Sequence, residues 1–246
     1  MEMPRRDIDH VRLPMLLHDR RRSRNTRERI RWIKSEEQKY EPELIKKIVK
    51  EASAKLPPIP LPIKHIVGLD SRFEQEVEPH LDTKSLDTVC MLEIYGAGGI
   101  GKTTFALNIY NKIRHQFEAS SFLADVREKS SKRKGLEDLQ KTLMSEMGEE
   151  TEAMMGSTFN GDFEIKRKLS NKRVLLVLDD VDKIEQLEAL AGGGDWFGSG
   201  SRIIITTRDT TMVDKHKMDG VDMKKYKMGE LNGDDSLELF CLHAFN

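Results

Sequence analysis

The sequence has few of the features that mark secreted, membrane-spanning or metal-binding proteins. Its two cysteines, Cys90 and Cys241, stand alone, with no Cys-x-x-Cys or histidine spacing around them. That pattern suits a reducing compartment and gives no metal site. The longest apolar runs, such as "VLLVL" at 174–178, are far shorter than the roughly 20 residues that span a bilayer. Because the first residues also lack the apolar core of a signal peptide, the sequence predicts a cytoplasmic protein without a membrane partner. A nuclear location is the alternative.

A strong net charge is also lacking. The 41 lysines and arginines nearly cancel the 42 aspartates and glutamates, which leaves a formal net charge of −1. No overall field therefore attracts nucleic acid or an anionic membrane, and any site for a polyanion must be local. The basic cluster "HDRRRSRNTRER" within residues 1–28 has no apolar periodicity, which is typical of a disordered leader; a nuclear-import signal is the alternative.

Three segments are expected along the chain. Residues 1–39 form the leader, and residues 40–63 contain an amphipathic helix from Glu43 followed by "PPIPLPI", which cannot continue a helix because proline lacks the amide donor. In residues 64–246, short continuous apolar runs alternate with helical periodicity. This alternation predicts an α/β domain of three layers, in which helices cover both faces of a mainly parallel sheet.

The stretch "YGAGGIGKTT" at 95–104 matches the phosphate-loop pattern G-x-x-x-x-G-K-[ST] between an expected strand and an expected helix. Glycines allow backbone N–H groups to surround a phosphate, and the start of the helix adds its positive dipole end. The pattern predicts a P-loop NTPase fold that binds a nucleotide. The phosphate-binding residues would be Gly98, Gly99, Ile100, Gly101, Lys102, Thr103 and Thr104, with Lys102 at the β- and γ-phosphates and the Thr103 hydroxyl on Mg²⁺.

Two later strands end in polar residues that could complete this site. "VLLVLDDVD" places Asp179 and Asp180 directly after an apolar run; Asp179 would orient the metal and Asp180 would polarise an attacking water. Helix capping or a turn is the structural alternative for this pair. "RIIITTRD" ends in Arg208, which could reach a terminal phosphate and distinguish a triphosphate from a diphosphate, or could instead pair with Asp209 at a helix start.

The order of these motifs resembles the nucleotide-binding domain of plant intracellular immune receptors. The matching stretches are "IYGAGGIGKTTFA", "FLADVRE", "KRVLLVLDDVD", "LEALAGGGDWFGSGSRIIITTRD" and "ELNGDDSLELFCLHAF". "FLADVRE" and "LDDVD" are similar to the class with an amino-terminal Toll/interleukin-1-receptor domain. The resemblance implies a switch that binds ADP at rest and ATP when active, with Mg²⁺, and it suggests other receptor chains as partners. In "IVGLDSRFE" it further implies that Val67 lies against adenine, with Arg72 as a weaker contact.

The sequence also departs from that family. No Toll-type fold is recognisable before Tyr40, so the NAD-cleaving activity of that domain is expected to be absent, and no leucine-rich repeat is expected after Asn246. Glu93 stands where glycine is common in the strand, which creates a risk for packing if the position is buried. Two other functions remain open: a phosphoryl-transfer kinase or general ATPase built from the same loop, and a non-enzymatic fragment that binds a full-length receptor.

Overall fold

The computed structural model of the chain describes residues 60–81, 87–149, 160–211 and 220–245. These residues belong to one compact unit, Ile59–Asn246. The expected leader at 1–39 and the expected helix from Glu43 lie outside the described residues. Of the expected linker, only residues 60–63 are described, and they contain no helix or strand.

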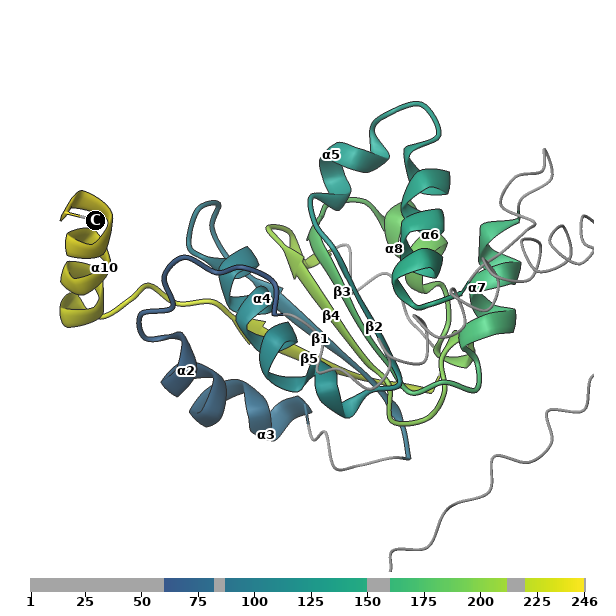
Figure 1. Cartoon of the computed structure of the whole chain (residues 1–246), viewed down its shortest axis with the longest axis horizontal. Helices are drawn as coiled ribbons and strands as arrows, with labels where there is room; N and C mark the ends of the chain where they lie inside the picture. The colour runs from purple at the N-terminus through teal and green to yellow at the C-terminus, as the bar shows by residue number, and fades with distance from the viewer. Residues whose placement is uncertain (1–59, 82–86, 150–159, 212–219, 246) are drawn as a thin grey trace, which may run out of the picture. The chain divides into compact units, whose positions relative to one another are not determined.

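The centre of the described unit is a five-stranded sheet in the order β2-β3-β4-β1-β5. Each neighbouring pair in this order is parallel, which confirms the expected sheet (Figure 1). Parallel neighbours need a crossover connection, and here the crossovers lie on the two faces of the sheet. The strands are β1 (Val89–Tyr95), β2 (Ala119–Leu123), β3 (Val174–Val181), β4 (Arg202–Thr207) and β5 (Val221–Lys227).

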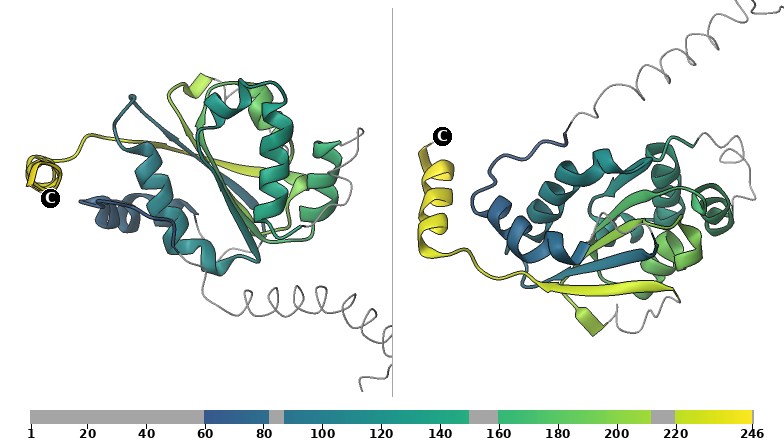
Figure 2. Two further views of the ribbon diagram at one scale, coloured as in Figure 1. Left: turned by 45° about the horizontal axis from the view of Figure 1, so that its top comes forward. Right: turned by 90° about the horizontal axis from the view of Figure 1, so that it is seen from below.

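Helices cover both faces of the sheet, so the three-layer prediction is also confirmed (Figures 1 and 2). One face is covered by α2 (Leu69–Arg72), the π-helical turn η1 (Phe73–Val77), α3 (Glu78–Leu81) and α4 (Lys102–Ile113), with the 3₁₀ turn η2 (Arg114–Gln116) following α4. The other face is covered by α5 (Val126–Ser130), α6 (Gly135–Glu146), α7 (Gly161–Leu169) and α8 (Ile184–Ala191), followed by the 3₁₀ turn η4 (Gly194–Trp196).

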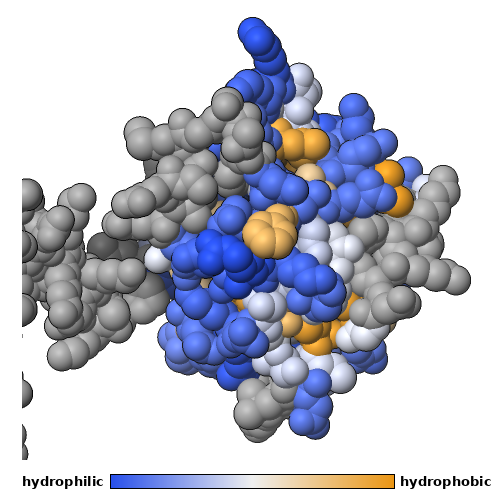
Figure 3. Space-filling model, turned by 90° about the vertical axis from the view of Figure 1, so that its right-hand side faces the viewer, coloured by the Kyte–Doolittle hydropathy of each residue, from blue (hydrophilic) through white to orange (hydrophobic). Residues whose placement is uncertain are grey.

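The core consists of two apolar clusters, one on each side of the sheet. Alternate residues of β3 divide between them, since Leu176 joins the cluster under α6 to α8 and Leu175 joins the cluster under α4. The outer surface is different in character: where described residues are visible, the side that carries α7 is mainly hydrophilic with separate apolar spots (Figure 3). Among the described residues, no helix combines the length and the hydrophobicity that crossing a bilayer requires.

Charged side chains from β1 and β4 are among those buried in the described unit. Arg202 of β4 is 1% exposed and donates to the backbone carbonyls of Leu81, Thr88 and Ser201, which compensates for its lost hydration. Glu93 of β1 is fully buried, which is the condition under which its packing was expected to be at risk, and it forms an ion pair of 3.5 Å with Lys225 of the neighbouring strand β5. The ion pair explains how the sheet accepts a carboxylate at this position.

The last described helix, α10 (Gly233–Phe245), follows β5 and stands clear of the helices that cover the sheet (Figures 1 and 2). None of its residues is buried. It approaches the segment before α2, where the ring of His65 lies 4.5 Å from the ring of His243. Its large apolar side chains Leu237, Phe240 and Phe245 are exposed.

Candidate functional site

The loop between β1 and α4 has the backbone shape of a phosphate-binding loop. Gly99 and Gly101 adopt φ values of 77° and 100°, a left-handed region that other residues rarely occupy. The chain can therefore turn sharply and enter α4 at Lys102. The Lys102 ammonium folds back and donates to the carbonyl oxygens of Gly96 at 2.9 Å and Ala97 at 2.8 Å. In this arrangement, the two carbonyl oxygens of the loop are the acceptors of the Lys102 ammonium, which in a phosphate-binding loop would be available to a phosphate.

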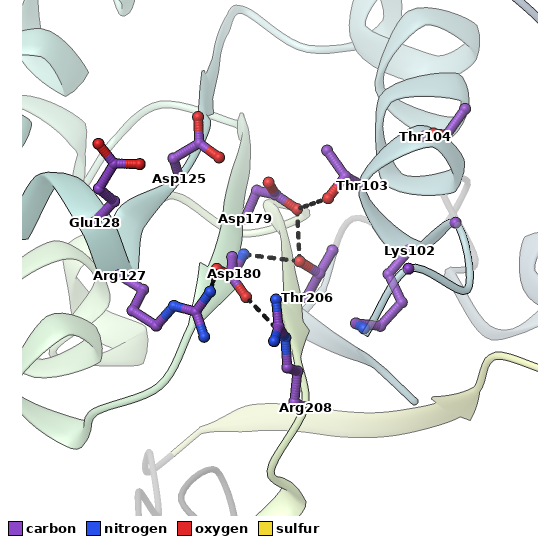
Figure 4. Close-up of a pocket in the computed structure, with 12 residues that line it drawn as sticks. Lys102, Thr103, Thr104, Asp125, Arg127, Glu128, Asp179, Asp180, Thr206 and Arg208 are labelled. Atoms are coloured by element: carbon purple, nitrogen blue, oxygen red, sulfur yellow. Dashed lines mark hydrogen bonds and ion pairs between the residues drawn. The ribbon is translucent and has the colours of Figure 1, made fainter. Parts of the chain in front are cut away.

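The end of β3 separates its two aspartates. The pairing of β3 with β4 shifts register between Leu178 and Val181, and Asp180 has a φ of 56°. Such an irregularity bends a strand and redirects its side chains, and a non-glycine residue in this region is often found at a functional site. As a result, Asp179 is buried toward α4 and β4, whereas the carboxylate of Asp180 points into the pocket (Figure 4).

Asp179 connects three elements through hydrogen bonds. Its Oδ1 accepts from the hydroxyl of Thr103 at 2.8 Å, at the start of α4, and from the hydroxyl of Thr206 at 2.6 Å, at the end of β4 (Figure 4). The Thr206 hydroxyl also accepts a 2.8 Å bond from the backbone N–H of Asp180. Thr206 thus fixes the position of one aspartate and the backbone of the next. This role of Thr206 was not predicted from the sequence.

Asp180 is held between two arginines. Its Oδ2 lies 2.9 Å from Nη2 of Arg127 in α5, and its Oδ1 lies 3.5 Å from Nε of Arg208, which follows β4 (Figure 4). Arg208 also passes over the phosphate loop, because a Cβ added to Gly98 would lie 3.3 Å from its Nη1. The Asp209 carboxylate accepts bonds from the backbone N–H and the hydroxyl of Thr211, at 2.9 and 2.8 Å.

These groups enclose a cavity of about 410 Å³ at the carboxyl ends of the strands. Burial lowers the pKa of Lys102 from its ordinary value and the Arg208 guanidinium lowers it further, while Asp180 and Asp179 oppose the shift. An anion in the cavity would relieve the repulsion between these two cations. The cavity is lined by Gly99, Gly101, Lys102, Thr103, Thr104, Asp125, Arg127, Glu128, Asp179, Asp180, Thr206 and Arg208.

Most of the residues predicted from sequence meet in this cavity, but three do not line it. Gly98 lies beneath Arg208, Ile100 packs against the core cluster under α4, and Val67 is half-buried in the turn before α2. Arg72, the weaker candidate, donates from Nη1 to the carbonyl oxygen of Gly229 and from Nη2 to that of Glu230, each at 2.9 Å. In this structure, Arg72 therefore connects α2 to the chain between β5 and α10.

Three cavity residues that sequence reasoning missed come from the segment after β2: Asp125, Arg127 and Glu128. Asp125 and Glu128 lie on the opposite side of the pocket from Lys102, whereas Arg127 reaches Asp180 (Figure 4). The sequence nevertheless contained a feature that could have indicated these residues. "FLADVRE" places these residues just after an expected strand, and in parallel sheets ligands bind outside the carboxyl ends of the strands.

Comparison with known families identifies this arrangement of loop and strand ends. The family model of the NB-ARC domain matches residues 72–246. The chain belongs to the NB-ARC family. Membership of this family supports nucleotide binding in general.

Curated relatives of this NB-ARC chain are plant disease resistance proteins. The chain is 37% identical to TMV resistance protein N of Nicotiana glutinosa over 84% of its length, and 40% identical to Disease resistance-like protein DSC1 of Arabidopsis thaliana over 74%. It is 42% identical to Disease resistance protein RUN1 of Vitis rotundifolia over 74%. The matched region spans 18%, 14% and 13% of those three proteins, respectively. The family resemblance expected from the motifs is confirmed.

A solved structure supports the fold. The structure of Cdc6p from Pyrobaculum aerophilum matches with a TM-score of 0.50 at 10% identity, covering 78% of this chain and 52% of that one. At this level of identity the likeness concerns the architecture alone, which is that of a P-loop α/β domain.

Proposed function

We propose that this domain binds ADP and ATP together with Mg²⁺ and works as a nucleotide-dependent switch in plant intracellular defence signalling. The observation that carries the proposal is the 2.8 Å hydrogen bond between Thr103 and Asp179, which are 76 residues apart in sequence. A hydroxyl at the end of a phosphate loop and a carboxylate at the end of a buried strand are the protein groups that accompany a nucleotide-bound magnesium ion. The names of the relatives, which are disease resistance proteins, support the proposed role in defence.

The donor set fits magnesium rather than a softer metal. Thr103 and Asp179 offer oxygen atoms, the ligands that Mg²⁺ prefers, and in nucleotide sites this ion usually takes its remaining ligands from phosphate and water. The described residues contain no group of three or more His, Cys, Asp or Glu side chains placed to hold an ion, so a nucleotide would be part of the metal site. When bound, the ion would neutralise phosphate charge.

The cationic residues would divide the phosphates between them. Lys102 would exchange the carbonyls of Gly96 and Ala97 for the β- and γ-phosphates, to which its ammonium bonds more strongly than to neutral oxygens. Arg208 would bind the γ-phosphate, since its guanidinium already lies over Gly98 of the loop.

Asp180 would polarise the water in a slow hydrolysis of ATP. Val67 would lie against the adenine, and other receptor chains would be partners of the domain in the cytoplasm.

Calorimetry and mass analysis test this function. We expect the purified chain to release ADP or ATP on denaturation and to bind ADP in a Mg²⁺-dependent manner. Lys102→Ala should weaken ADP binding at least tenfold, equivalent to about 1.4 kcal/mol, while the circular dichroism spectrum stays unchanged. Lys183→Ala, an exposed lysine before α8, is the control and should leave the affinity as it was. Equal affinities of wild type and Lys102→Ala would refute the assignment of the phosphate loop.

Magnesium coordination needs its own variant. Asp179→Asn should abolish the Mg²⁺ dependence of ADP binding, because an amide oxygen is a weaker ligand for this ion than a carboxylate. Asp180→Asn should retain the Mg²⁺ dependence and lose the slow hydrolysis. If both variants lose the Mg²⁺ dependence equally, the proposed division of roles between the two aspartates is wrong.

A further inference from the structure

Arg127 lines the proposed site, and the proposed function assigns it no role. Arg127 belongs to α5, which follows β2 along the chain. It forms the shorter of the two ion pairs of Asp180, at 2.9 Å against 3.5 Å for Arg208. The two arginines contact different oxygens of the carboxylate and approach it from different sides of the pocket (Figure 4). One negative charge is therefore shared between two guanidinium groups.

Arg208 is placed so that it can leave this arrangement. Its side chain is 53% exposed, and its guanidinium lies close to both Asp180 and Gly98 of the phosphate loop. A γ-phosphate at the loop would compete with Asp180 for Arg208, because both are anions within reach of the same group. How readily Arg208 turns to the phosphate depends on how strongly Asp180 retains it.

We propose that Arg127 is a positioning residue that raises the preference of the site for a nucleoside triphosphate over a diphosphate, by holding Asp180 and so making Arg208 available. The proposal rests on the nucleotide-binding function proposed above. While Arg127 is present, Asp180 keeps its closer partner when Arg208 moves away. Without Arg127, Asp180 has Arg208 as its remaining arginine partner, and a γ-phosphate must compete with the full attraction of the carboxylate.

The backbone supports this role for Asp180 as a fixed partner. Its φ of 56° and the hydrogen bond from its N–H to Thr206 hold its Cα at the bend of β3. The Asp180 side chain is 22% exposed, less than those of Arg127 at 42% and Arg208 at 53%. The Asp180 carboxylate is therefore held in place, whereas the two arginine side chains are more exposed. This arrangement allows Arg208 to exchange Asp180 for a γ-phosphate.

The test compares the affinities of the full chain for ADP and for a non-hydrolysable ATP analogue, measured by calorimetry with Mg²⁺ at physiological salt. Arg127→Gln should lower the ratio of ATP-analogue affinity to ADP affinity about two- to fivefold, the size typical of partly exposed ion pairs. Arg127→Lys keeps the charge and should restore most of the ratio. Asp180→Asn should raise the ratio, because it releases Arg208.

The control is Arg167→Gln in α7, which removes the same charge from an arginine that is 49% exposed and also paired with a carboxylate, that of Glu164. It should leave the ratio unchanged. The double variant Arg127→Gln/Asp180→Asn decides the mechanism. If Arg127 acts through Asp180, the double variant should have the same ratio as Asp180→Asn alone.

Three results would overturn the proposal. The first is a ratio for Arg127→Gln equal to that of the wild type. The second is a loss of equal size in the Asp180→Asn background, which would indicate that Arg127 contacts the phosphate directly. The third is a melting temperature of Arg127→Gln far below that of Arg127→Lys, with both affinities falling together, which would indicate a purely structural role. If the wild type binds neither nucleotide, the proposed function fails as well, and this result differs from all three.

Discussion

The carboxyl ends of β3 and β4 and the helix α10 lie at opposite extremes of burial in the described chain. β4 is buried along its whole length, and the polar groups at its end bond to one another at 2.6 to 2.8 Å. α10 has no buried residue, and Phe240 and Phe245 are 64% and 81% exposed. The contacts that connect α10 to the rest are few, such as the ring contact of His65 with His243 and the two bonds from Arg72 to the connection before it.

This difference has a physical consequence for a switch. Side chains attached to buried strands are held in place by packing, as a site needs when it must keep phosphate, metal and carboxylate within a few tenths of an ångström. An element connected by a few polar contacts opens at much lower free energy than the core. We therefore expect any nucleotide-linked movement to occur at α10 and at the chain before it, while the ends of β3 and β4 stay in place.

Among changes in and around the site, the largest effect on stability should come from the core beneath it. Leu176 of β3 is fully buried in the cluster under α6 to α8. Leu176→Ala removes buried methyl groups and leaves a cavity, so the free energy of unfolding should fall by about 2–5 kcal/mol. Urea denaturation followed by circular dichroism measures this change. A loss below about 1 kcal/mol would mean that the sheet relaxes easily, and the contrast with α10 would not hold.

A smaller effect is expected where the site itself is joined to the sheet. Thr206→Val keeps the shape of the side chain but removes the hydroxyl, so the backbone N–H of Asp180 loses its acceptor and Asp179 loses a donor. An unsatisfied buried group costs about 1–3 kcal/mol. Denaturation should show that loss, and calorimetry should show weaker Mg²⁺-dependent binding of ADP. Thr142→Val, on the exposed side of α6, is the control and should affect neither measurement.

Much of this site could be predicted because its parts follow local rules. The spacing from Gly96 to Thr103 defines a phosphate loop without reference to any distant residue. Asp179 follows the most apolar run in the sequence, and the end of a buried parallel strand is where such folds place their ligands. The fold class and the residues that stand directly at strand ends could therefore be predicted.

The contacts of Arg127 and Arg72 could not be predicted in the same way. The pair Arg127–Asp180 depends on β2 and β3 being neighbours, and sequence alone did not supply the strand order. It also depends on the irregularity of β3, which turns Asp180 away from Asp179. Arg72 was considered for nucleotide contact because of the family pattern, but its partners are backbone carbonyls 157 and 158 residues away. No side-chain pattern in the sequence marks an exposed carbonyl as a partner.

Arg72 offers the next test of the contrast between the buried ends of β3 and β4 and the exposed helix α10. Arg72→Met keeps the length of the side chain but loses both hydrogen bonds to the connection before α10. Because those carbonyls are exposed and can bond to water, we expect a loss of about 1 kcal/mol or less in the free energy of unfolding. Hydrogen exchange should report a larger local change, with faster exchange of the amides in α10 and unchanged exchange in β3 and β4. Arg167→Met should change neither region, and a uniform change across the chain would contradict a local role of Arg72.

The smallest effect should come from the apolar face of α10 itself. Phe240 is 64% exposed, so Phe240→Ser removes little buried area, and the free energy of unfolding should change by less than about 0.5 kcal/mol. Phe105→Ser is the matched comparison in α4, because Phe105 is fully buried against the sheet; truncating such a side chain costs about 3–5 kcal/mol, and the serine hydroxyl adds to the cost. Both variants are measured by urea denaturation at two protein concentrations. If Phe240→Ser lost as much stability as Phe105→Ser at either concentration, α10 would be packed in solution against another surface, and its exposure would not distinguish it from the core.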